Sequence, residues 1–180
     1  MAITSVDILF KFSVVAAAGN TNAGTAATSL GDQISTTQIT DATLNNLFDD
    51  VTGDENAASD VEYRCIFVHN AHATLTWQNV VVWLSAEVGG GASVAIAIDD
   101  FAASPIGQAS AQADVIADEG TAPGAGVGAF SSPTTKGTGL SLGNIAAGSC
   151  RAIWIKRSAA NTAAVDNDGV TIRCEGDTAA

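Results

Sequence analysis

Two histidines, His69 and His72, are separated by two residues and could together offer two imidazole ligands to a metal ion. Zinc sites use three or four ligands, mostly His and Cys. The chain has no third histidine, and no cysteine stands close to this pair in the sequence. The spacing therefore favours polar residues of a short hairpin connection, and we expect no zinc site here.

A second candidate for metal binding is the segment AVDNDGVTIRCE, residues 164–175, which partly matches a calcium-binding loop. The residues that match its third, fifth, sixth and twelfth positions are Asp166, Asp168, Gly169 and Glu175. Ala164 stands at the first position, where the motif needs a carboxylate. The second half of the segment also alternates like a strand, whereas a calcium loop of this kind runs into a helix. We therefore expect a strand and no bound metal or cofactor.

Nucleophilic catalysis would need a Ser or Cys with a nearby base. Cys150 precedes Arg151, which could favour a thiolate, but no histidine lies near it in the sequence. No serine stands in a G-x-S-x-G motif. The three cysteines are predicted to be buried thiols, with a Cys65–Cys174 disulfide as the alternative. We expect a protein that is not an enzyme.

The charge balance narrows the choice of partners. The chain of 180 residues carries 7 Lys and Arg against 19 Asp and Glu, a net charge of −12. Binding to nucleic acid or to an anionic membrane needs clustered positive charge, so neither partner is expected. The first 20 residues lack a basic start and are interrupted by Asp7 and Lys11, which favours neither a signal peptide nor a membrane span.

The elements that must position these residues are short strands. Eight to ten segments rich in β-branched and aromatic residues alternate with Gly-, Ala- and Asn-rich stretches, and helical periodicity is nearly absent. This pattern predicts an all-β fold, an antiparallel β-sandwich of jelly-roll or immunoglobulin-like type with long Gly/Ala-rich loops. We expect an N-terminal strand and flexible arm at residues 1–40, a sandwich body at 41–176 and a tail at 177–180.

Two of these strands carry apolar side chains on both faces. In TLTWQNVVVWLSAEV, residues 74–88, one parity holds Trp77 and Trp83 while the other holds Val80 and Val82. In CRAIWIKRS, residues 150–158, the core pair of isoleucines sends a tryptophan to the opposite face. Either the chain's own long loops or a second subunit covers these faces, and we favour a subunit. The candidate interface residues are Trp77, Trp83, Trp154, Lys156, Phe10 and Phe12.

About half of the chain resembles a known group of proteins. The segments concerned are MAITSVDILFKFS, NLFDDVTGDENAASDVEYRCIFVHNAHATLTWQNVVVWLS, GLSLGNIAAGSCRAIWIKR and RCEGDT. Their pattern of strands and turns resembles small virion proteins of tailed bacteriophages, most of all the capsid decoration (cement) proteins. The resemblance carries no active-site motif, so it implies no site residue.

The resemblance implies a structural role. The chain would be made in the cytoplasm of the bacterial host, bind the major capsid protein on the capsid exterior, and stabilise the shell as a homo-oligomer, with a trimer favoured. Residues 1–40 would then be an arm exchanged with a neighbour. The alternatives are another virion component (tail tube, head-closure or fibre-associated subunit) and a carbohydrate-binding or adhesive β-sandwich.

Overall fold

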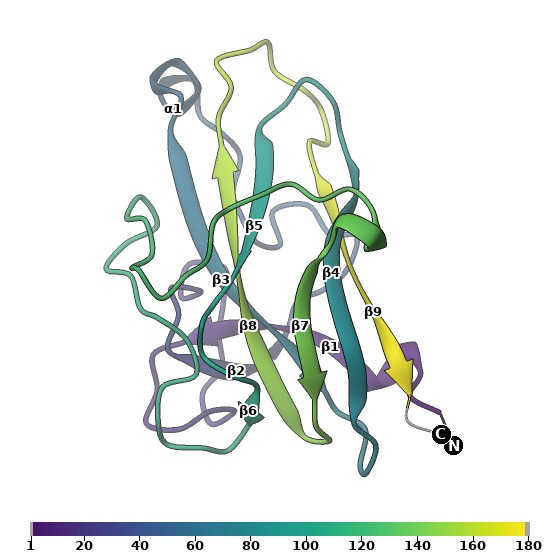
Figure 1. The fold of residues 1–180 in the computed structure, drawn as a ribbon. Helices are drawn as coiled ribbons and strands as arrows, with labels where there is room; N and C mark the ends of the chain where they lie inside the picture. Colours follow the sequence, from purple (N-terminus) through teal and green to yellow (C-terminus); the bar gives the residue numbers. More distant parts are fainter. Residues whose placement is uncertain (1, 179–180) are drawn as a thin grey trace.

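The computed structural model describes residues 2–178 and forms an antiparallel β-sandwich of two sheets (Figure 1). The larger sheet has the order β2-β1-β3-β8-β5, with the short β6 paired to β8. Its strands are β1 (Ile8–Val14), β2 (Gln33–Gln38), β3 (Val61–Asn70), β5 (Ser93–Ile98), β6 (Ser104–Pro105) and β8 (Ser149–Ser158). The predicted all-β sandwich is confirmed.

The smaller sheet has the order β7-β4-β9 and packs in front of the larger one (Figure 1). Its strands are β4 (Trp77–Glu87), β7 (Leu140–Ile145) and β9 (Val170–Thr178). The helical elements are α1 (Gly53–Ala58) and two 3-10 turns, η1 (Ser5–Asp7) and η2 (Lys136–Thr138). Because Thr52 caps α1 and accepts a hydrogen bond from the Glu55 N–H, this single turn of helix forms inside the acidic loop before β3.

The core between the sheets is built from one face of each long strand. β3 and β8 pair in unbroken register from Val61–Ser158 to Asn70–Ser149, so alternate residues of both point at the smaller sheet. The buried side chains of this core include Ile66, Val68, Val80, Val82, Leu84, Leu142, Ile153 and Ile155. They carry the period-two pattern that identified the strands in the sequence.

A β-bulge explains why Trp77 enters the same core as Val80 and Val82, from which its parity in the sequence separates it. The pairing of β4 with both neighbours shifts register after Trp77–Gln78, and Asn79 adopts a left-handed φ of 51°. The extra residue reverses the parity, so Trp77 joins Val80 and Val82 in the core although it has the other parity in the sequence. Trp83 points to the opposite face of β4 and is also buried.

A second apolar cluster covers the outer face of the larger sheet. Trp154 is fully buried there, and its Nε1–H donates to Asp99 Oδ2 (2.8 Å). The residues packed around it come from the sheet and from the chain's own loops: Leu30, Ile34, Cys65, Phe67, Ala113, Ile116, Val127 and Phe130. The expectation that a second polypeptide covers Trp154 is therefore wrong, and the alternative, the chain's own long loops, is what the structure has.

The N-terminal region is part of the sandwich body. β1 pairs with β3 from Ile8–Asn70 to Phe12–Ile66, and β2 pairs with β1. This corrects the expected arm at residues 1–40, because β1 and β2 extend the larger sheet and the segment between them packs on its outer face. At the other end, Asp177 and Thr178 belong to β9, while residues 179–180 of the expected tail lie outside the described residues.

Candidate functional site

Two of the residues that could bind a metal ion, His72 and Asp168, have structural partners instead. His72 Nδ1 accepts the N–H groups of Thr74 and Leu75 (3.1 and 3.0 Å), which shapes the β3–β4 turn. Asp168 Oδ2 accepts the Ala92 N–H (2.6 Å), so the partial calcium motif holds the loop before β5. Within residues 2–178, no three His, Cys, Asp or Glu side chains are grouped in a way that could hold a metal ion. No helix in the same range is long and apolar enough to cross a membrane.

The cysteines are free thiols in the structure, as predicted. Burial raises the pKa of Cys150 to about 12. The hydrogen bond that Gln112 Nε2 donates to its sulfur (3.2 Å) acts in the opposite direction, but its effect is smaller. A thiol of that pKa stays protonated at neutral pH and is a poor nucleophile. Cys65 lies in the outer-face cluster and Cys174 packs against the core between the sheets, so the alternative Cys65–Cys174 disulfide is not formed.

The six candidate interface residues do not form one surface. Trp77 and Phe12 are buried in the core between the sheets, and Trp154 lies under the loops of the outer face. Trp83 is only 6% exposed, and Lys156 is half-buried on the outer side of β8. Only Phe10 and Trp77 meet at a feature open to solvent, a groove beside β9.

This groove lies between β9 and the N-terminal part of the chain. It has a volume of about 360 Å³, and its apolar lining consists of Ile3, Ile8, Phe10, Trp77, Ile172 and Cys174. β9 is the last strand of the smaller sheet, and residues of β1 in the larger sheet line the groove together with it. The apolar inner faces of β1 and β9 are therefore left without a further strand above them, and Ile8, Phe10 and Ile172 remain partly exposed.

Among the sheet edges of residues 2–178, the outer edge of β9 is the least covered, with Ile3, Thr4 and Ser5 near its end, where they line the groove with Glu175 and Gly176. At β2, the edge is covered by the chain itself, since Ile34 O accepts from Asn20 N and Thr36 N donates to Asn22 O. At β5, Ile96 exchanges two backbone hydrogen bonds with Ser131.

At β7, side chains reach the edge carbonyls: Arg151 binds Leu142 O (2.8 Å) and Asn70 binds Ile145 O (2.9 Å). At β9, the contact from outside the sheet is the Ile3 N–H, which donates to Thr178 Oγ1 at the end of the strand. β9 pairs only with β4. A long, regular strand with unpaired backbone groups is a template for another strand.

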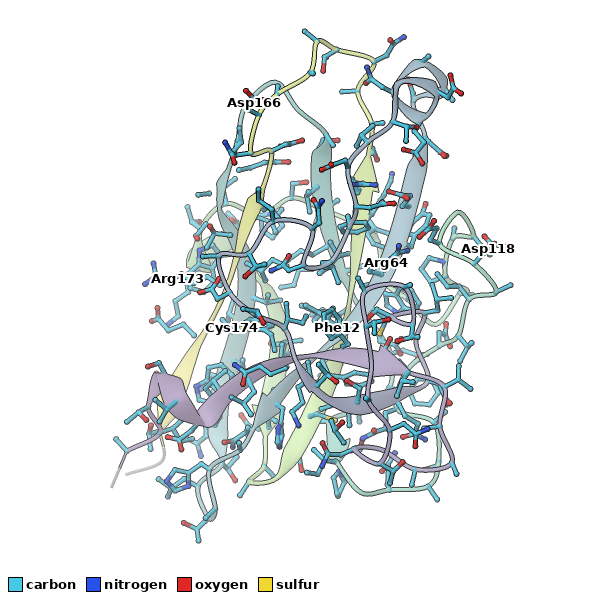
Figure 2. The ribbon with its side chains drawn as sticks, turned by 180° about the vertical axis from the view of Figure 1, so that it is seen from behind. Phe12, Arg64, Asp118, Asp166, Arg173 and Cys174 are labelled. Carbon is cyan, nitrogen blue, oxygen red and sulfur yellow. The ribbon has the colours of Figure 1, made fainter. Side chains whose placement is uncertain are left out.

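Charged side chains line the solvent face of this edge strand. Arg173, Glu175 and Asp177 alternate with the inward-facing Ile172 and Cys174 and are exposed. Figure 2 shows Arg173 and Cys174 on opposite sides of β9. Lys136 Nζ contacts Glu175 Oε1 (2.6 Å), and this hydrogen bond raises the pKa of Lys136. The face therefore carries charges of both signs at a spacing of two residues.

No protein-family model, curated protein or solved structure matches this chain. The candidate site therefore rests on its geometry: an uncovered edge, an apolar groove and alternating charges. Phe10 and Trp77 were expected at an interface from the sequence, whereas Arg173, Cys174 and Glu175 were not. The alternation of β9 was visible in the sequence, but the position of a strand at the edge of a sheet depends on the tertiary pairing.

Proposed function

We propose that this chain is a non-enzymatic structural protein of a tailed-bacteriophage virion, a decoration protein that binds the major capsid protein on the capsid exterior. The observation that carries the proposal is the uncovered β9 edge beside its apolar groove, because strand addition to such an edge is a common way to build assemblies. The resemblance of about half the chain to decoration proteins and the net charge of −12 agree with this role.

The mechanism would be mechanical. A protein that binds only the assembled shell stabilises it by mass action, since its binding free energy is added to the assembled state alone. Association of several copies multiplies weak contacts with neighbouring capsid subunits into strong attachment. A rigid body suits this task, and both faces of the larger sheet are covered here, one by the smaller sheet and one by the chain's own loops.

Purified particles of the phage that encodes the chain test the proposal. We expect quantitative mass spectrometry to find a copy number comparable with that of the major capsid protein, and electron microscopy to place the chain on the outer surface of the shell. Particles that lack the chain should lose their DNA at lower temperature, and added purified chain should restore them. A copy number matching a single ring at the neck or tail, or absence from the particle, would contradict the proposal.

A further inference from the structure

We propose that β9 pairs with β9 of a second copy of this chain, antiparallel and about a twofold axis at Cys174, to form one six-stranded sheet from the two smaller sheets. This inference builds on the association role proposed above and names the partner of the β9 edge. It predicts a twofold pair in place of the trimer expected from the resemblance. Three observations carry it: the direction of the edge groups, the charge pattern and the apolar groove.

The backbone of β9 presents its free groups in a regular row. Val88 N donates to Gly169 O (2.9 Å), so Gly169 faces β4. Both register shifts between the strands insert their extra residues into β4, and β9 continues without a bulge. Because successive residues of a strand direct their backbone groups to opposite sides, the N–H and C=O groups that face the free edge belong to Val170, Ile172, Cys174 and Gly176.

The charges select one register for self-pairing. With the axis at Cys174, Arg173 of each copy lies opposite the partner's Glu175, which gives two cross-strand ion pairs. Hydrogen bonding between the two strands requires that edge-facing residues of one copy lie opposite edge-facing residues of the other. The two nearest alternative registers that meet this condition have the twofold axis at Arg173 or at Glu175. The axis at Arg173 places two arginines directly opposite one another, which destabilises a sheet. The axis at Glu175 pairs Arg173 of each copy with the partner's Asp177, but it also places two glutamates directly opposite one another, so the axis at Cys174 has two ion pairs without a like-charge pair.

The apolar side of β9 also fits a second copy. Paired residues of antiparallel strands point to the same face, so Ile172 of the partner would lie beside Gly176, where the Trp77 indole fills the place of a side chain. Ile172 and Cys174 of the second strand would then extend the apolar inner face over the groove lined by Ile8 and Phe10. Such a pair hides apolar surface that a single copy leaves open.

Variants that reverse the charges of β9 test this register. The dimerisation of each purified variant is measured by sedimentation equilibrium. Arg173→Glu and Glu175→Arg should each weaken dimerisation by about tenfold or more, because two attractive pairs become repulsive ones. The double variant R173E/E175R exchanges the charges and should restore the affinity. The matched controls are Lys156→Glu, with the same charge change on the larger sheet, and Asp118→Arg, in an exposed loop (Figure 2). At physiological salt, both should leave the dimer affinity unchanged.

Cysteine cross-linking gives a second readout. The two Cys174 residues form a hydrogen-bonded antiparallel pair with Cα atoms about 5.5 Å apart, within the range that a disulfide spans. Burial also raises the pKa of the Cys174 thiol, so a disulfide-forming oxidant, diamide, is added at alkaline pH. It should give a covalent dimer that Cys174→Ser abolishes, whereas Cys65 and Cys150 are buried and should not contribute.

A chain that stays monomeric at high concentration, a dimer insensitive to R173E, or failure of the double variant to recover would overturn the self-pairing. The particle copy number proposed above would still be tested by its own measurement.

Discussion

At the scale of single residues, His69 is the group with the clearest predicted pH effect. It is 5% exposed on the outer face of β3, and neither ring nitrogen has a hydrogen-bond partner. Cys150 pairs with it on β8, and Lys11 on β1 pairs with Phe67, the neighbour of His69 on the same face of β3. The pKa of His69 is lowered from 6.5 to about 4, mainly by burial and to a smaller extent by the positive charge of Lys11. The folded protein therefore resists protonation of this imidazole.

The sign of the effect follows from proton binding. Between pH 6.5 and about 4 the unfolded chain binds a proton at His69 that the folded chain does not, so stability is lost as the pH falls through this range. From about pH 7 to about pH 5, the free energy of unfolding should fall by about 2 kcal/mol from this residue alone. Urea unfolding at the two pH values measures it.

The matched variant is His69→Leu, which fills a similar volume and cannot titrate. Carboxylates also titrate in acid, but they do so in both proteins and cancel in the difference. We expect the loss of stability on acidification to be smaller in the variant by about 2 kcal/mol. Equal losses in the two proteins would contradict the prediction.

The sequence predicted only part of the chemistry of these residues. The H-x2-H spacing correctly favoured a hairpin role for His72, whose partners are local. It could not show that His69 is covered, because residues 15–32 and 101–131 lie far from β3 in the sequence and supply much of the outer layer. Trp154 was misassigned to an interface for the same reason: a face that looks unpartnered along a strand can be covered by distant loops.

At the scale of elements, the bulge at Asn79 sets which side chains of β4 enter the core. Its φ of 51° is a conformation that glycine and asparagine tolerate and β-branched residues avoid. Asn79→Val should therefore cost about 1–2 kcal/mol, which lowers the melting temperature by about 2–8 °C in a chain of this size. Asn79→Gly keeps the backbone accessible and should remain close to the parent protein.

Thermal unfolding followed by circular dichroism compares the two variants. Both lose the hydrogen bond from Asn79 Nδ2 to Asp177 Oδ2 (3.1 Å), so the difference between them reports the backbone conformation. If the Val variant melts at the same temperature as the Gly variant, the left-handed conformation does not hold the bulge.

Most of the strands could be predicted from the sequence, because composition and period-two alternation are local signals. The bulge could not, since one extra residue leaves the sequence rich in β-branched residues and changes only the parity. Without it, Trp77 is assigned to the face of β4 opposite Val80 and Val82. The pairing of β1 with β3 was missed because the Gly- and Ala-rich residues after β1 resemble a mobile arm, although they pack against the larger sheet. The sequence also does not show which strands pair, so the position of β9 at the edge of its sheet could not be predicted.

At the scale of the whole molecule, long-range repulsion competes with the local ion pairs of the proposed dimer. Each copy has a net charge of −12, so two copies repel over distances well beyond contact. Salt screens that repulsion efficiently, because the Debye length falls from about 30 Å at 0.01 M to about 8 Å at 0.15 M. The two Arg173–Glu175 pairs act at contact distance and contribute only about 0.2–1 kcal/mol each.

We therefore expect the dimer to become tighter as the salt concentration rises between these two values, as measured by sedimentation equilibrium in NaCl. The control Lys156→Glu makes the net charge −14, since it replaces one positive by one negative charge. It should dissociate more than the parent chain at low salt and match it at physiological salt, where the added repulsion is screened over a much shorter distance. An affinity that falls with salt in both proteins would mean that the contact pairs outweigh the repulsion between the two acidic bodies.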